Sequence, residues 1–134
     1  MLKDKLYKIT LSDHQEFTIH ATLELDKNDE IFIGHFPGQP VLPGACMLQM
    51  VKEVLENTLT KSLMLTKANQ IKFLRLIDPG IDNILQLTIT YKPGDNNHIN
   101  VTATITVLKD ICFKFKGIFS AIYMPFYFVL CCAI

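Results

Sequence analysis

Hydrophobic and polar residues alternate along several stretches of the chain, which is the pattern of half-buried β-strands. The clearest stretch is residues 16–25, where the apolar side is formed by Phe17, Ile19, Ala21, Leu23 and Leu25. Further strands are expected at residues 6–12, 67–76, 83–92, 98–108 and 111–122. Turn-forming residues separate them in the segments DKNDE, DPG and PGDNN.

A helical period replaces the alternation between residues 44 and 60. The apolar face of this segment is wide and consists of Met47, Leu48, Met50, Val51, Val54, Leu55, Thr58 and Leu59, with Gln49, Lys52, Glu53, Glu56, Asn57 and Thr60 on the other side. Before it, Pro37, Pro40 and Pro43 each fix φ and remove a backbone donor. We therefore expect a stiff extended loop that leads into a central helix.

This order of elements predicts an α+β fold with an antiparallel sheet curved around one helix. Residues 1–122 are expected to form a single domain, and residues 123–134 an apolar C-terminal tail. No charge occurs from Ile118 to the end, but this run is short for a membrane span and Pro125 interrupts it. We expect no stable span and a tail that packs on the domain or on a partner.

Composition narrows the classes of function. Thirteen basic residues balance thirteen acidic ones without a charged run, so a nucleic-acid footprint is not expected. The N-terminus lacks an apolar signal core, which points to the cytoplasm.

No metal site or cofactor is expected. The four cysteines lack metal-type spacing and are interpreted as reduced thiols: Cys46, Cys112, Cys131 and Cys132. Solvated side chains are expected for His14, in a polar loop, and for His20 and His98.

The proline loop carries a family resemblance. Residues 35–44 read HFPGQPVLPG, and residues 71–80 read IKFLRLIDPG. The first resembles the HFP-x-x-P-x-x-PG loop of the hot-dog-fold β-hydroxyacyl-[acyl carrier protein] dehydratases, and the second resembles their KFRRPVVPG strand. Every fixed position of the loop is matched, by His35, Phe36, Pro37, Pro40, Pro43 and Gly44. Within this family the branch linked to aryl-polyene and flexirubin pigments looks most similar.

The resemblance implies a hot-dog fold, in which an antiparallel sheet wraps one long helix and two subunits pair edge to edge. Each active site would take the loop histidine from one subunit and a helix carboxylate from the other, in a homodimer or a heterodimer with a paralogous subunit. The substrate would be a 3-hydroxyacyl thioester on an acyl carrier protein. That carrier is acidic, so Lys72, Arg75 and Lys92 are candidates to meet it.

The residues suit the implied chemistry. Loss of water from a 3-hydroxyacyl thioester requires removal of the α-carbon proton, for which His35 is the candidate base. The thioester oxygen gains negative charge, and the N–H of Gly44 at the helix N-terminus is the candidate donor that stabilises it. The candidate substrate-binding residues are Phe36, Pro43, Ala45, Leu48 and Phe73.

The helix departs from the family where the catalytic acid is expected. Fourteen positions after His35 the family has Glu or Asp, but this chain has Gln49, which does not release a proton at neutral pH. Three interpretations follow: a dehydratase that works with Gln49, a weak or silent subunit that pairs with an active homologue, or an acyl thioesterase. Glu53, one turn further on, is a candidate substitute acid, although a solvated side chain is the simpler interpretation.

Overall fold

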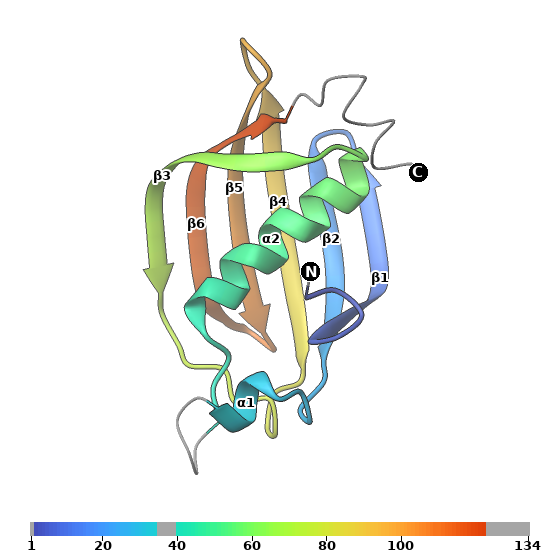
Figure 1. Ribbon diagram of the computed structural model, residues 1–134, viewed down its shortest axis with the longest axis vertical. Helices are drawn as coiled ribbons and strands as arrows, with labels where there is room; N and C mark the ends of the chain where they lie inside the picture. The colour runs from blue at the N-terminus through green and yellow to red at the C-terminus, as the bar shows by residue number, and fades with distance from the viewer. Residues whose placement is uncertain (1, 35–39, 123–134) are drawn as a thin grey trace, which may run out of the picture.

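A single antiparallel sheet wraps one long helix in the computed structural model, which describes residues 2–34 and 40–122 (Figure 1). The helix is α2 (Gly44–Leu59), and a four-residue helix, α1 (Ile31–Gly34), precedes it. The six strands are β1 (Tyr7–Gln15), β2 (Thr18–Leu25), β3 (Leu63–Phe73), β4 (Ile84–Pro93), β5 (His98–Val107) and β6 (Asp110–Ala121). The prediction of an α+β fold with a central helix is confirmed.

The strand order in the sheet is β1-β2-β4-β5-β6-β3. All pairs are antiparallel, and β4, β5 and β6 follow one another through tight turns. In the β4–β5 turn Asn96 and Asn97 have φ of 58° and 62°, a left-handed conformation that Asn adopts more readily than most residues. Strand β3 follows α2 and pairs with β6, so β1 and β3 form the two edges of the sheet.

The core lies between the inner face of the sheet and α2. Along β4 the buried positions alternate with exposed or half-buried ones and are Leu85, Leu87, Ile89 and Tyr91. On α2 the fully buried apolar positions are Met50, Val51, Val54 and Leu55. Full burial of such a side chain contributes about 1.5–3 kcal/mol, so this face holds the helix against the sheet.

The first hairpin differs from the prediction. His14 belongs to β1 rather than to a polar loop, and its Nε2 lies 2.7 Å from the hydroxyl of Tyr91. The chain reverses at Glu16, where φ is 54°, so Phe17 falls in the turn and is 53% exposed instead of joining the apolar face of β2. The alternating pattern continued through the turn and concealed it.

Strand β3 begins four residues earlier than expected and ends at Phe73. Leu63 is fully buried at its start, which the weak alternation of residues 63–66 did not indicate. After Phe73 the N–H groups of Leu74 and Arg75 both donate to the carbonyl of Cys112, and the chain leaves the ladder there.

Two of the four cysteines are described, and both are buried thiols. Burial raises the pKa of Cys46 and of Cys112, which disfavours the thiolate. Cys131, Cys132 and the predicted C-terminal tail lie outside the described residues. Within residues 2–34 and 40–122, no helix has the length and apolarity needed to cross a bilayer.

The pairing of β3 with β6 depends on Gly117. A Cβ at this position would overlap the backbone oxygen of Lys67 and lie 2.6 Å from the Phe115 ring. We expect Gly117→Ala to destabilise the protein by about 1–3 kcal/mol, because the neighbouring strand must shift. Urea unfolding measures this. Gly94→Ala is the control, since its Cβ would meet only Asn100 and His98 at 3.3 Å or more; equal stability of the two variants would contradict the prediction.

Candidate active site

Residues 40–44 of the proline loop lie beside residues 73–77 of the second resembling segment at the N-terminus of α2. The N–H of Leu42 donates to the carbonyl of Ile77 over 2.8 Å, which joins the proline loop to the segment that follows β3. The ring of Phe73 occupies the space beside Gly44, where a Cβ would lie 2.6 Å from Cε1 and Cζ. Glycine at position 44 therefore leaves room for the ring in this position.

The first turn of α2 presents open backbone donors. Pro43 caps the helix in an extended conformation, with φ −63° and ψ 146°, and supplies no side-chain hydrogen bond. Cys46 and Met47 donate to the carbonyl of Pro43, whereas no acceptor among the described residues bonds the N–H of Gly44 or Ala45. Unsatisfied N–H groups and the positive end of the helix dipole together favour a negatively charged or polarised oxygen.

The candidate substrate-binding residues fall into different environments. Phe73 is 57% exposed and packs on Phe113 with ring centroids 5.4 Å apart. Ala45 is exposed, and Pro43 and Leu48 are half-buried. Three of the described candidates therefore gather around the first turn of α2, with Leu48 one turn further along. His35 and Phe36 lie outside the described residues.

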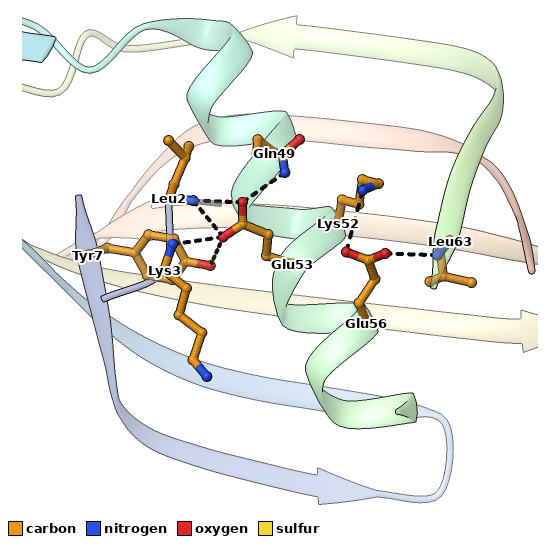
Figure 2. Close-up of polar contacts among 8 residues, drawn as sticks. All are labelled: Leu2, Lys3, Tyr7, Gln49, Lys52, Glu53, Glu56 and Leu63. Atoms are coloured by element: carbon orange, nitrogen blue, oxygen red, sulfur yellow. Dashed lines mark hydrogen bonds and ion pairs between the residues drawn. The ribbon is translucent and has the colours of Figure 1, made fainter. Parts of the chain in front are cut away.

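A buried carboxylate is the main polar feature of α2, and sequence reasoning misread it. Glu53 is only 2% exposed and is not the solvated side chain that its place on the polar face of the helix suggested. Figure 2 shows it at the centre of five hydrogen bonds from four groups. The donors are the N–H of Leu2 (3.0 and 3.1 Å), the N–H of Lys3 (2.8 Å), the hydroxyl of Tyr7 (3.1 Å) and Nε2 of Gln49 (2.7 Å).

These hydrogen bonds decide the protonation state of Glu53. Burial by itself raises the pKa of the carboxyl group, but the hydrogen bonds from Leu2, Gln49, Lys3 and Tyr7 outweigh it and lower the pKa below the ordinary value of 4.5. Burial and the nearby Glu53 charge raise the pKa of the Tyr7 hydroxyl, which stays protonated as a donor. The lowered pKa favours the Glu53 anion at neutral pH, which holds no proton to give to a leaving hydroxyl group, so this environment disfavours the predicted role of Glu53 as a substitute acid.

The N-terminal segment forms part of this site, which no motif in the sequence indicated. Leu2, Lys3 and Tyr7 reach α2 from a chain end about fifty residues away in sequence. The only sequence signal was the four-residue spacing of Gln49 and Glu53, which places the two side chains on one face of a helix.

One candidate contact for an acidic partner is already paired. Arg75 donates to Asp82 and to Asp110, each over 2.9 Å, so its charge is balanced within the chain. Lys72 and Lys92 are exposed. Of the three basic residues considered, these two remain open to a partner surface.

Comparison with known proteins identifies the family and the fold. The family model of the ApeI-like proteins, described as ApeI dehydratase, matches residues 11–115. One chain of the structure entitled "The Dehydratase Heterocomplex ApeI:P from Xenorhabdus doucetiae" superimposes with a TM-score of 0.73 at 22% identity, over 85% of this chain and 97% of that chain. These matches define a hot-dog fold of the dehydratase class. The chain belongs to the ApeI-like dehydratase family.

Curated relatives come from the same class. A 3-hydroxyacyl-[acyl-carrier-protein] dehydratase FabZ of Wolbachia pipientis is 34% identical over 82 residues, which cover 54% of this chain and 55% of the relative. The FabZ of Rickettsia felis is 29% identical over 118 residues, covering 80% of this chain and 75% of the relative. The chain thus spans little more than half the length of the first of these relatives.

The lowered pKa of Glu53 makes stability depend on pH. The folded carboxyl has a lower pKa than the unfolded one, so its stabilising effect is complete above the unfolded value and is lost as the pH falls below about 4.5. We expect the unfolding free energy of wild type to exceed that of Glu53→Gln by about 1–2 kcal/mol at pH 7, because hydrogen bonds to an anion are replaced by weaker ones to a neutral amide. Urea unfolding from pH 7 to 3 should show this difference shrinking in acid; parallel pH profiles would contradict the assignment.

Proposed function

We propose that the protein removes water from a 3-hydroxyacyl thioester carried by an acyl carrier protein, giving the trans-2-enoyl thioester. The observation that carries this proposal is the open first turn of α2, which directly follows the family loop and lies against Phe73. A thioester carbonyl seated there would receive the N–H of Gly44 as its charge develops. Family membership supports the same reaction class.

The proposed reaction uses His35 for both proton transfers. Its imidazole takes the proton from the α-carbon, and the electrons of that C–H bond shift toward the thioester, whose oxygen is stabilised by Gly44. The imidazolium then gives the same proton to the 3-hydroxyl as the C–O bond breaks, so water leaves and the double bond forms. His35 returns to its neutral state. Gln49 positions the hydroxyl and transfers no proton.

The second candidate function is a weak subunit that pairs with an active homologue. The Xenorhabdus structure is of a dehydratase heterocomplex, so a hot-dog fold similar to this one occurs in a mixed assembly. Gln49 in place of an acid favours this candidate, because a partner could supply the missing carboxylate. The open donors at Gly44 favour retained thioester binding in either case.

The role of His35 has a direct test. We expect His35→Ala to lower the rate of dehydration, and of the reverse hydration of a trans-2-enoyl carrier-protein thioester, by a factor of at least about 100, since general acid–base catalysis contributes roughly 10²–10⁴-fold. Absorbance of the enoyl thioester follows either direction. Activity retained in His35→Ala would remove this residue from the mechanism.

The two candidate functions separate when an acid is restored at position 49. Gln49→Glu alone would place a second carboxylate beside Glu53, where Gln49 Nε2 is now 2.7 Å from Oε2. The double variant Gln49→Glu/Glu53→Gln keeps a donor–acceptor pair, because the new Gln can accept from Leu2, Lys3 and Tyr7 through its oxygen and donate to the new Glu. If wild type is fast and the double variant has nearly the same dehydration rate, the protein is a dehydratase that works with Gln49. If wild type is nearly inactive and the rate of the double variant is more than about tenfold higher, the protein is the weak subunit.

We also propose a dimer with a shared site. Strand β3 is an eleven-residue edge strand whose exposed side chains include Met64 and Ile71, and an open edge of this length is suited to pairing with another subunit. We expect an experimental structure of the assembly to place His35 of one subunit within about 10 Å of Gln49 of the other, and hydrogen-bond reach is about 3 Å once substrate is bound. A greater separation across every subunit contact would contradict the shared site.

A further inference from the structure

We propose that Glu53 is a positioning residue that fixes the side-chain amide of Gln49 with its oxygen, Oε1, directed to the substrate as an acceptor for the 3-hydroxyl group. This inference rests on the proposed function for the identity of the substrate. The arrangement itself rests on the hydrogen bond of 2.7 Å between Gln49 Nε2 and Glu53 Oε2.

The chemistry of the pair determines which end of the amide faces Glu53. An ionised carboxylate only accepts hydrogen bonds, so the NH₂ group of Gln49 must face it. The flipped amide would set a carbonyl oxygen against a buried anion. Figure 2 shows the resulting arrangement, in which the amide nitrogen of Gln49 points at Glu53 and its oxygen points away.

Glu53 is held too firmly to follow a rotation of Gln49. Its Oε1 accepts from the N–H of Leu2, the N–H of Lys3 and the hydroxyl of Tyr7, and its Oε2 accepts from Leu2 and Gln49. The side chain is 2% exposed, so water does not replace these donors. The contacts of Glu53 with the N-terminal segment therefore decide which end of the Gln49 amide faces Glu53.

The open atom of Gln49 is an acceptor. No donor among residues 2–34 and 40–122 bonds Gln49 Oε1, and the residue is half-buried. A 3-hydroxyl group can donate to this oxygen, whereas a 3-oxo group has only lone pairs to present. The site should therefore prefer 3-hydroxyacyl thioesters to 3-oxoacyl thioesters of the same length. The hydroxyl oxygen also keeps its lone pairs for the proton that His35 returns.

Glu53→Gln tests the inference by reversing the polarity. The oxygen of the new Gln would keep the contacts of Oε1 with Leu2, Lys3 and Tyr7, and its NH₂ would replace Oε2, which ends the second contact with the N–H of Leu2. Gln49 must then turn its oxygen toward position 53 and its NH₂ toward the substrate. With pantetheine thioesters at pH 7, we expect the wild type to bind the 3-hydroxyacyl ligand about tenfold more tightly than the 3-oxoacyl ligand, and Glu53→Gln to bind them equally or in reverse order. An unchanged ratio in a folded variant would overturn the proposal.

Tyr7→Phe is the matched control. It removes one hydrogen bond to Glu53 Oε1 but leaves Oε2 and Gln49 untouched. We expect it to lower stability and to keep the wild-type ligand ratio. If Tyr7→Phe lowers the preference for the 3-hydroxyacyl ligand as much as Glu53→Gln does, the preference depends on how firmly the N-terminal segment is packed. This result would overturn the positioning role of Glu53.

A measurement on the wild-type protein covers the case in which Glu53→Gln does not fold. In an NMR titration, the side-chain ¹⁵N–¹H signals of Gln49 should shift as Glu53 takes up a proton in acid. Signals that do not change over this titration would overturn the proposal. The readout does not depend on turnover, so it stands apart from the His35→Ala assay. If the Gln49 signals shift with the titration of Glu53 but the protein binds neither thioester, the recognition of the 3-hydroxyl group is overturned, and the proposed function with it.

Discussion

The buried carboxylate of Glu53 is the interaction on which the site depends. Glu53 is 2% exposed, and a buried charge is stable only if nearby donors replace water. Here the donors are backbone and side-chain groups of residues 2–7 and the amide of Gln49 on α2. The same hydrogen bonds tie residues 2–7 to the central helix, keep Glu53 ionised and orient Gln49. One carboxylate therefore both stabilises the fold and orients the proposed substrate-binding residue Gln49.

The other half of the proposed site is the first turn of α2. Proline at position 43 begins the helix without a side-chain cap, and glycine at position 44 leaves room for the Phe73 ring, so backbone donors stay open beside an apolar surface. Gln49 lies further along the same helix. The oxyanion donor and the hydroxyl acceptor that we propose both lie on a helix, so each is held by a rigid element rather than by a loop.

Much of this architecture could be predicted from the sequence. Alternation identified most strands, the helical period placed α2 within one residue, and the motif around Pro43 and Gly44 indicated the family. Phe17 was misplaced because the alternation continues through a hairpin whose turn has a positive φ at Glu16, and His14 was misplaced because the end of β1 is as polar as a loop. Glu53 was misread because most of its donors come from the distant segment of Leu2, Lys3 and Tyr7, and no local pattern reveals such contacts.

The most direct test is an experimental structure of the dimer with a non-reactive 3-hydroxyacyl thioester analogue. We expect the 3-hydroxyl to donate to Gln49 Oε1 over about 2.8 Å, with Gln49 Nε2 still bonded to Glu53 and His35 of the other subunit at the α-carbon. A 3-hydroxyl bonded elsewhere, with Gln49 Oε1 more than about 5 Å away, would contradict it.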